Sequence, residues 1–377
     1  MTTEDAFRRY SATKYFTALD GVRALSAALV VAWHARESPL KFLQGERGVT
    51  VFLVLSGFLI TMLALREEDR DGKLSVREFF IRRVFRILPL YYIVLAGYAI
   101  LANLAGSAEK AASFNESLPW YIFYLSEIPL LLNEVEAPFN HSWSLGIEEK
   151  FYFVWPFIAF VLMANSKLRL PLAFVTGSLL LLAGFARPGY GSWVSLVEPY
   201  GHILVGTALA FALHHQRSFN WLAFLAKPAA YWAVGFASVV IGVIDTAWAF
   251  ELLAIPTALF IGAMVLQPNH PISRLFSTRL LVWLGTLSYA VYLIHPAVLA
   301  VFERLIPAQS GRIDDLATLV LGYVASALLG AVLHRTVEKP FIHYGRRFAK
   351  PRAKDSLGQN NQLSDLKIVR GADQISD

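Results

Sequence analysis

Apolar runs of about 17 to 23 residues recur along most of this chain, and they constrain its fold more than any other feature. A run of this length crosses the hydrocarbon core of a bilayer as an α-helix, which satisfies its own backbone hydrogen bonds there. Only 16% of the residues are charged and 56% are hydrophobic, whereas a soluble domain carries about a quarter charged residues. We therefore expect an all-α fold, a polytopic transmembrane helical bundle.

The runs predict about ten membrane spans, with both termini in the cytoplasm. Residues 119–132 are apolar but short, and they contain Pro119, Glu127 and Pro129, so we expect a re-entrant or interfacial segment there. If this segment does not cross, most basic loops fall on the cytoplasmic side, as the positive-inside rule requires. The expected spans are residues 19–36, 48–65, 85–105, 147–164, 170–186, 194–213, 229–245, 247–266, 280–302 and 316–337.

Three parts follow from this pattern. Residues 1–18 are a polar cytoplasmic segment without a small-residue cleavage site, so the first span is expected to stay in place as an anchor. Residues 19–345 form the transmembrane domain, and residues 346–377 form a polar cytoplasmic tail that we expect to be disordered.

Charge and cysteine content exclude several classes of function. The net charge of +6 comes from basic residues in short loops between spans, which is typical of membrane topology and not of a nucleic-acid-binding face. The chain has no cysteine, which excludes disulfides, thiolate metal sites and a cysteine nucleophile. The sequence predicts no metal site.

The first span carries ionisable residues, which are costly inside a membrane and usually face a bundle interior or a cavity. Asp20 lies one helical turn from Arg23, and His34 lies about three turns further along the same face. One interpretation is a positioning ion pair near the interface, with a hydrated histidine at the far end. Because all three residues share one stripe, we favour a functional site.

Two further stretches lie in the second span and in the cytoplasmic loop that follows it. Ser56, in the second span, is expected either to contact a substrate or to bond its own helix backbone. The basic loop after this span ends with Arg82, Arg83 and Arg86, and the last two are one turn apart on one side. Such a cluster either sets topology and attracts anionic headgroups or clamps phosphate, because guanidinium forks match phosphate oxygens.

The mouth of the fourth span concentrates polar and aromatic groups. Ser144 is expected to cap the helix, and Glu148 and Glu149 then fall near the first turn, where the helix dipole favours carboxylates. His141 and Trp143 precede them, and a carboxylate in this setting can orient an imidazole.

A polar stripe also marks the ninth span, where Ser288, Tyr292 and His295 follow i, i+4, i+7 spacing. Such a stripe predicts a cavity wall, although a lone histidine beside Pro296 fits an interhelical hydrogen bond equally well.

Taken in order, these stretches resemble the acyltransferase-3 family of polytopic membrane O-acyltransferases. The matching sequences are LDGVRALSAALVVAWH, GVTVFLVLSGFLI, RRVFRILP, HSWSLGIEEKFYFVWP, LSYAVYLIHP and VEKP, over residues 15–345. Members modify cell-surface glycans, lipopolysaccharide, nodulation factors or macrolides. The resemblance implies a ten-helix domain in the bacterial cytoplasmic (inner) membrane. It would move an acyl group, acetyl by default, from cytoplasmic acyl-CoA to an acceptor hydroxyl.

The resemblance also implies roles for individual residues. His34 and Arg23 match the essential histidine and arginine of the family, and Glu148 matches the glutamate that follows Trp-Ser-Leu. These three are the expected catalytic residues. The expected substrate-binding residues are Arg83, Arg86, Asp20, Ser56, Trp143, Glu149, Tyr292 and His295.

Combined with helix geometry, these matches predict direct transfer. Asp20 and His34 are separated by about 20 Å of helix rise, comparable with the reach of the pantetheine arm of CoA. His34 would act as general base, Glu148 would hold its tautomer or stabilise the imidazolium, and Arg23 would steady the thioester or the oxyanion. An acyl-histidine or acyl-serine intermediate is the alternative route.

The expected partners follow from the same prediction. They are acyl-CoA as donor substrate, a glycan or other hydroxyl acceptor, and membrane lipids, with no nucleic acid and no permanently bound cofactor. Some family members carry a fused esterase-like domain, and we expect this membrane domain to act alone or with a partner. Oligomeric state stays open.

Two other functions compete with acyl transfer. In a transporter, Arg23, His34 and Glu148 would form a proton or anion relay. A structural subunit of a glycan-assembly complex would tolerate His34→Ala without effect. The transporter accounts for the intramembrane charges but not for the cytoplasmic arginine cluster or for the order of the motifs.

Overall fold

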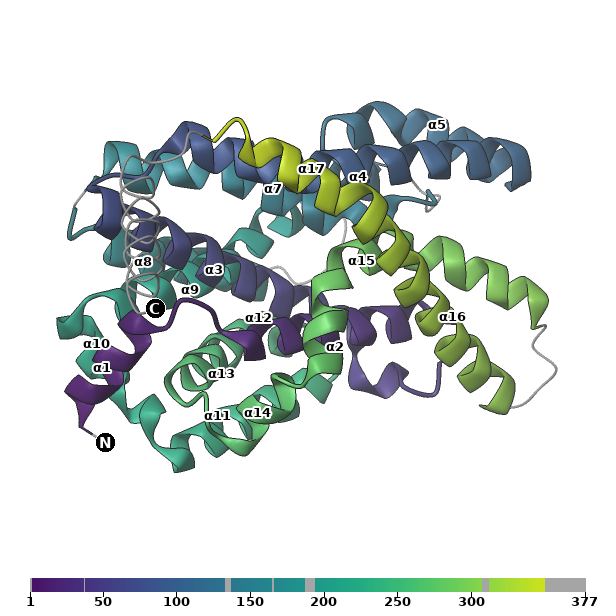
Figure 1. The fold of residues 1–377 in the computed structure, drawn as a ribbon. Coiled ribbons are helices and arrows are strands. Elements are labelled where there is room, and N and C mark those ends of the chain that lie inside the picture. The colour runs from purple at the N-terminus through teal and green to yellow at the C-terminus, as the bar shows by residue number, and fades with distance from the viewer. Residues whose placement is uncertain are drawn as a thin grey trace, which may run out of the picture.

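The computed structural model describes residues 2–36, 38–132, 137–164, 166–186, 194–306 and 312–349. In these ranges every regular element is a helix and no β-strand occurs (Figure 1), so the all-α prediction is confirmed. The predicted polar tail, residues 346–377, lies outside the described residues from position 350 onward.

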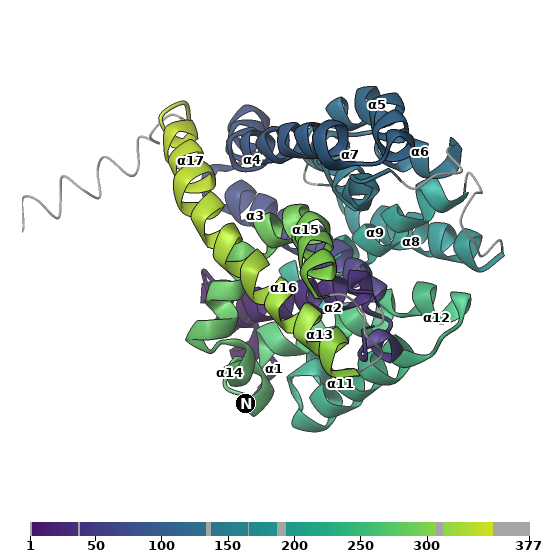
Figure 2. The ribbon, with the colours of Figure 1, turned by 90° about the vertical axis from the view of Figure 1, so that its right-hand side faces the viewer.

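The chain forms a bundle of seventeen labelled α-helices joined by short 3-10 and π-helical turns within the described ranges (Figures 1 and 2). The α-helices are α1 (Thr3–Ala12), α2 (Thr17–His34), α3 (Gly48–Asp71), α4 (Val76–Ala105), α5 (Ala108–Ile122), α6 (Glu127–Leu132), α7 (Trp143–Phe157), α8 (Arg169–Ala186), α9 (Val194–His214), α10 (Gln216–Leu222), α11 (Pro228–Val243), α12 (Ala247–Leu252), α13 (Ala254–Leu266), α14 (Pro271–Phe276), α15 (Arg279–Leu305), α16 (Arg312–Leu333) and α17 (Lys339–Arg346). The shorter turns are η1 (Lys41–Leu43), η2 (Gly45–Arg47), η3 (Asn140–Ser142), η4 (Ile158–Leu162), η5 (Ala223–Ala226) and η6 (His334–Glu338).

Seven helices of the described chain are long and apolar enough to cross a membrane, and the number rises to nine if each of two bent pairs forms one span. The bent pairs are α1 with α2, at 76°, and α10–η5 with α11, at 83°. The predicted span at residues 147–164 corresponds to α7 and η4 and is not among these helices. The structure supports a multi-pass helical membrane protein, while ten spans and cytoplasmic termini stay predictions.

Residues 119–132 are divided between two short helices. α5 ends at Ile122 and α6 begins at Glu127, and Tyr124 between them adopts a positive φ of 58°. Neither helix is among the candidate spans. This agrees with the prediction that the segment does not cross on its own.

Helices on either side of the predicted basic loop run further than their apolar sequences suggest. α3 continues to Asp71 and ends where Gly72 takes a left-handed φ of 77°, and α4 begins at Val76. Most of the predicted basic loop is therefore helical, which fixes the direction of its arginines. A glycine is favoured at such a helix end because it has no Cβ to clash.

Close helix contacts hold the centre of the bundle together. α2 and α15 lie side by side there (Figures 1 and 2), and a Cβ on Gly285 would lie 1.9 Å from the carbonyl oxygen of Asp20. α3 and α9 meet in the same way, because a Cβ on Gly57 would lie 1.9 Å from the carbonyl oxygen of Ile203. Small residues at these crossings allow the backbones to approach, as is common for membrane helices.

Candidate active site

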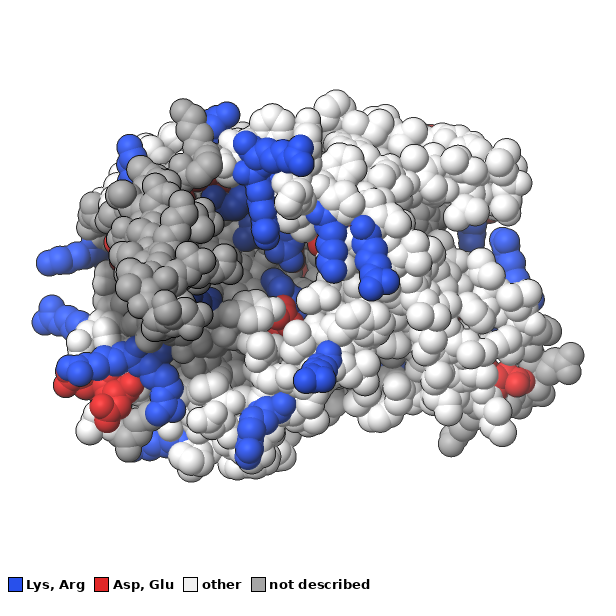
Figure 3. All heavy atoms as spheres, viewed as in Figure 1, with Lys and Arg blue, Asp and Glu red and all other residues white. Residues whose placement is uncertain are grey.

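Two adjoining chambers of about 100 and 150 Å³, which we call the arginine cavity, lie between α2, α3, α4, α7 and α15. The walls of both chambers contain Arg23, Ser56, Arg83, Arg86 and Tyr152. Figure 3 shows lysine and arginine side chains gathered around a hollow on this face of the molecule. Two of the expected catalytic residues and six of the expected substrate-binding residues thus line this cavity: Arg23 and Glu148, and Asp20, Ser56, Arg83, Arg86, Glu149 and Tyr292.

An ion pair on α2 forms part of this cavity. Arg23 Nη1 donates to Asp20 Oδ1 at 3.1 Å, which confirms the predicted pairing one turn apart. The hydroxyl of Tyr15 donates to the other oxygen of Asp20. Both acceptor atoms of the carboxylate are therefore used, and Arg23 is held at the wall shared by the two chambers.

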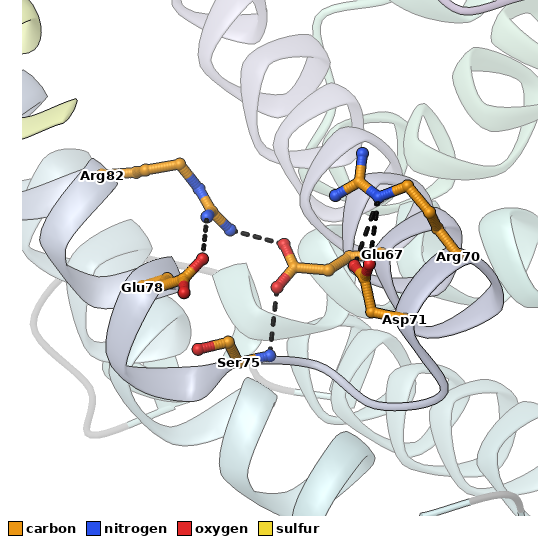
Figure 4. Close-up of polar contacts among 6 residues, drawn as sticks. All are labelled: Glu67, Arg70, Asp71, Ser75, Glu78 and Arg82. Carbon is orange, nitrogen blue, oxygen red and sulfur yellow. Dashed lines mark hydrogen bonds and ion pairs between the residues drawn. The ribbon is translucent and has the colours of Figure 1, made fainter. Parts of the chain in front are cut away.

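The three arginines of α4 separate into two roles. Arg82 donates to Glu67 at 2.6 Å and lies 3.7 Å from Glu78, and Glu67 also accepts the backbone N–H of Ser75 (Figure 4). Arg82 therefore ties the start of α4 to the end of α3.

Arg83 and Arg86 instead line the arginine cavity. The guanidinium of Arg83 lies over the rings of Phe79 and Tyr152, at 5.7 and 5.1 Å from their centroids. Within the part of the chain that the structure describes, neither arginine has a carboxylate within ion-pair distance. Two cations without a fixed counter-ion suit an anionic ligand.

Glu148 also belongs to the arginine cavity, together with Glu149. It accepts hydrogen bonds from the hydroxyls of Tyr152, at 2.9 Å, and Ser56, at 3.3 Å, and these two hydroxyls contact each other. Ser56 thus bonds across helices and not to its own backbone, which was the alternative interpretation. Tyr152 was not predicted, although its position four residues after Glu148 is the spacing of neighbours on one helix face.

A second cavity of about 180 Å³, the histidine cavity, contains His34. The side chain of His34 is exposed to it, and Nδ1 lies 2.9 Å from the carbonyl oxygen of Val30. Since a carbonyl only accepts, Nδ1 carries the hydrogen and Nε2 of the neutral ring has the free lone pair. Other residues of this wall include Trp33, Glu46, Asn140, His141 and Trp143.

Two buried histidines lie beside His34. The ring of His295 is edge-on to His34, with centroids 4.8 Å apart, and to His141, with centroids 5.4 Å apart. His295 Nδ1 donates to the carbonyl of Tyr292 at 2.7 Å, within its own helix, so the predicted interhelical hydrogen bond is not formed. His141 Nε2 donates to the carbonyl of Leu293 at 3.1 Å. Each of the three rings therefore retains one nitrogen as an acceptor.

Tyr292 lines both cavities and separates them. Its hydroxyl donates to the carbonyl of His141 at 2.6 Å and accepts from the Ser144 hydroxyl at 2.7 Å. The predicted capping role of Ser144 is wrong, because α7 begins at Trp143 with Ser142 in the N-cap position, and Ser144 binds Tyr292 instead.

The geometry also separates residues that the sequence had paired. Glu148 lies in the arginine cavity and His34 in the histidine cavity, and the carbonyl of Val30 holds the His34 tautomer in place of the expected carboxylate. Arg23 and His34 are eleven residues apart on α2, which corresponds to about 16 Å of rise. The two residues line different cavities.

Several wall residues were missed by sequence reasoning. Asn140, Glu46 and Tyr15 had no detectable signal, since each lies in a loop or short turn whose path depends on tertiary packing. His141 was noticed in its motif but not assigned a role. Among the described residues, no group of three or more histidine or acidic side chains is placed to hold a metal ion.

The fold and the two cavities define an integral membrane protein with a polar site inside its helical bundle. A family model described as an acyltransferase domain matches residues 16–335, so the chain belongs to the acyltransferase-3 family and to the acyltransferase class of enzymes. No solved structure matches the chain.

Curated relatives are bacterial. The peptidoglycan O-acetyltransferase OatA of Listeria monocytogenes is 30% identical over 380 aligned positions, which cover 90% of this chain and 58% of the relative. The protein named "Putative peptidoglycan O-acetyltransferase YrhL" of Bacillus subtilis is 30% identical over 367 positions, covering 89% and 56%. A "Putative O-acetyltransferase" of Staphylococcus aureus (strain COL) is 28% identical over 380 positions, covering 92% and 60%. The chain thus spans less than two thirds of the length of these relatives.

Proposed function

We propose that this protein transfers an acyl group, acetyl by default, from acyl-CoA to a hydroxyl of a glycan at the bacterial cytoplasmic membrane. The observation that carries the proposal is the junction at Tyr292, where a cavity lined by unpaired arginines meets a cavity lined by an exposed histidine. The first suits a phosphate-bearing donor and the second suits proton transfer from an acceptor.

The donor enters the arginine cavity from the side of Lys14 and Tyr15, which the predicted orientation places in the cytoplasm. Arg83 and Arg86 bind the CoA diphosphate, and the pantetheine arm carries the thioester toward Tyr292. Because Arg23 lies far from His34, we assign it to holding the donor and not to the oxyanion. Glu148 keeps Ser56 and Tyr152 in place along this path.

His34 acts as general base in the histidine cavity. Its free Nε2 takes the proton of the acceptor hydroxyl while the hydroxyl oxygen bonds to the thioester carbonyl carbon. The carbon–sulfur bond then breaks, and the departing sulfur receives the proton from His34, which yields CoA as a free thiol. This route needs no covalent acyl-enzyme, which agrees with the absence of cysteine.

A glycan is the acceptor that the histidine cavity favours. Trp33 and Trp143 provide aromatic surface, and Glu46 and Asn140 provide acceptors and donors for hydroxyl groups. Because relatives are named for peptidoglycan, this polymer is the first acceptor to test. Family membership favours acyl transfer over the transporter hypothesis.

The test supplies membranes with radiolabelled acetyl-CoA and either peptidoglycan or a surface-glycan extract. We expect wild-type protein to label the glycan and His34→Ala to be slower by roughly 10² to 10⁴, the usual contribution of a general base. His343→Ala is the matched control, since His343 is an exposed histidine of α17 outside both cavities, and it should keep wild-type activity.

Two outcomes would contradict the proposal. Equal labelling by wild type and His34→Ala would remove His34 from the chemistry. No labelling by wild type from acetyl-, succinyl- or longer acyl-CoA would count against acyl transfer itself.

A further inference from the structure

A third cavity of about 340 Å³, which we call the α1 cavity, lies where α1 packs near the end of α3 and the α9–α10 junction. Its wall includes Phe7 and Tyr10 of α1, Arg66 of α3, and His214 and His215 at the junction. Figure 1 shows α1 beside α10 at the edge of the bundle. The mechanism proposed above uses none of these residues.

The α1 cavity continues the arginine cavity along α3. Met62 lines both the α1 cavity and the second chamber of the arginine cavity. From Ser56, beside Glu148, to Arg66 the helix rises about 15 Å, and to Asp69 about 20 Å. The α1 cavity thus lies beyond the chamber that contains Arg83 and Arg86, on the side away from Tyr292, where the nucleotide end of a donor held by these arginines would extend.

Arg66 provides a cation in this cavity. Its guanidinium lies over the rings of Tyr10 and Phe16, at 5.7 and 5.4 Å from their centroids, and donates to the carbonyls of Tyr10 and Lys14 at 3.3 Å each. In the described part of the chain, no carboxylate forms an ion pair with it. Three of its five N–H donors are left for a ligand phosphate.

The junction between α9 and α10 adds further polar groups. His214 Nε2 lies 3.3 Å from Asp69 Oδ1, and the His215 ring is edge-on to His214 at 4.8 Å between centroids. His215 is exposed and can donate a ring N–H. Cationic and ring N–H donors for phosphate and a carboxylate acceptor for ribose hydroxyls together suit a nucleotide.

The segments that form this cavity also lie on the expected side of the membrane. The N-terminal segment, the end of α3 and the α9–α10 junction are all cytoplasmic in the predicted orientation. Acyl-CoA is a cytoplasmic metabolite, so its nucleotide end would meet this surface before the thioester reaches Tyr292.

We propose that the α1 cavity binds the 3′-phosphoadenosine end of the acyl-CoA donor. This inference rests on the proposed function, because it assumes that acyl-CoA is the donor. It predicts that the cavity contributes to donor affinity and not to the chemical step.

The test compares two acetyl donors on purified full-length protein. One is acetyl-CoA, and the other is S-acetyl-N-acetylcysteamine, which has a thioester but no nucleotide. His215→Glu, which places a negative charge in the cavity, should raise the KM for acetyl-CoA by about tenfold, as expected for one lost charge-assisted contact. Its rate with S-acetyl-N-acetylcysteamine should equal that of wild type, which also shows that the variant is folded.

Arg217→Glu is the matched control, because Arg217 is an exposed residue of the same segment that does not line the cavity. It should leave both donors unaffected. The inference is overturned if Arg217→Glu raises the KM for acetyl-CoA as much as His215→Glu does. It is also overturned if His215→Glu leaves this KM unchanged or affects both donors equally.

A direct measurement of nucleotide binding distinguishes failure of the α1-cavity proposal from failure of the proposed function. Adenosine 3′,5′-bisphosphate, titrated into purified protein, should bind wild type and bind His215→Glu about tenfold more weakly. If wild type transfers from neither donor, the proposed function fails, while selective loss of nucleotide binding in His215→Glu would still support the α1 cavity. Equal binding by both proteins would reject it.

Discussion

The arginine cavity and the histidine cavity meet at Tyr292 but are made of different chemical groups. The walls of the arginine cavity carry Arg23, Arg83 and Arg86 together with the carboxylates of Glu148 and Glu149. In the histidine cavity, the imidazoles of His34 and His141, with buried His295 beside them, are each fixed by a backbone carbonyl, and none is paired with a carboxylate of the described chain. The first arrangement suits the binding of an anion, and the second suits the exchange of a proton.

This difference suggests a division of labour that the sequence alone did not reveal. If the arginine cavity binds the donor and the histidine cavity transfers the proton, substitutions in the arginine cavity should alter the affinity for the donor. Substitutions in the histidine cavity should alter the turnover rate. A substitution in one cavity that altered both the donor affinity and the turnover rate would contradict this division.

The largest expected effect on the arginine side comes from removing both unpaired arginines. In the double variant Arg83→Ala and Arg86→Ala, the KM for acetyl-CoA should rise roughly 100-fold, because two charge-assisted contacts to phosphate are lost. The KM for the glycan acceptor should not change. Initial rates measured against the concentration of each substrate would show this.

Arg82→Ala provides the control for that experiment. It removes a charge from the same turn of α4, but Arg82 is ion-paired with Glu67 and does not line the cavity. We expect some loss of thermal stability, since the ion pair between Arg82 and Glu67 is lost, and no change in the KM for acetyl-CoA. A rise comparable with that of the double variant would mean that general surface charge, and not a phosphate site, governs donor affinity.

A smaller effect is expected at the junction. Tyr292→Phe keeps the ring but removes the hydroxyl bonded to Ser144 and to the carbonyl of His141. Leaving these buried groups unsatisfied should cost about 1–3 kcal/mol of stability, seen as a lower midpoint of thermal unfolding. Turnover should fall without a change in donor KM. A donor KM raised as far as in the arginine double variant would place Tyr292 on the donor side alone.

Much of the fold was predictable because hydrophobic length and helix periodicity are local properties. Each of the ten expected spans corresponds to a helix or helix pair in the described chain, and Asp20 and Arg23 pair one turn apart as predicted. Arg83 and Arg86 line one cavity, as their spacing indicated. Helix ends were less predictable: α3 and α4 extend into the basic loop, whose residues also suit a helix.

The unpredicted part of the site depends on long-range packing. The contact between His34 and His295 joins residues 261 positions apart, counted from their numbers, and its edge-on geometry follows from the crossing of α2 and α15. The separation of Glu148 from His34 has a similar origin, because it depends on where α7 packs along α3. No local pattern encodes either relation.

The most direct test measures equilibrium binding of acetyl-CoA to purified protein alongside its transfer to glycan. The account predicts that His34→Ala binds acetyl-CoA as tightly as wild type while transfer is lost, and that the Arg83→Ala, Arg86→Ala double variant binds it roughly 100-fold more weakly. Loss of donor binding in His34→Ala, or wild-type affinity in the double variant, would contradict the division between the two cavities.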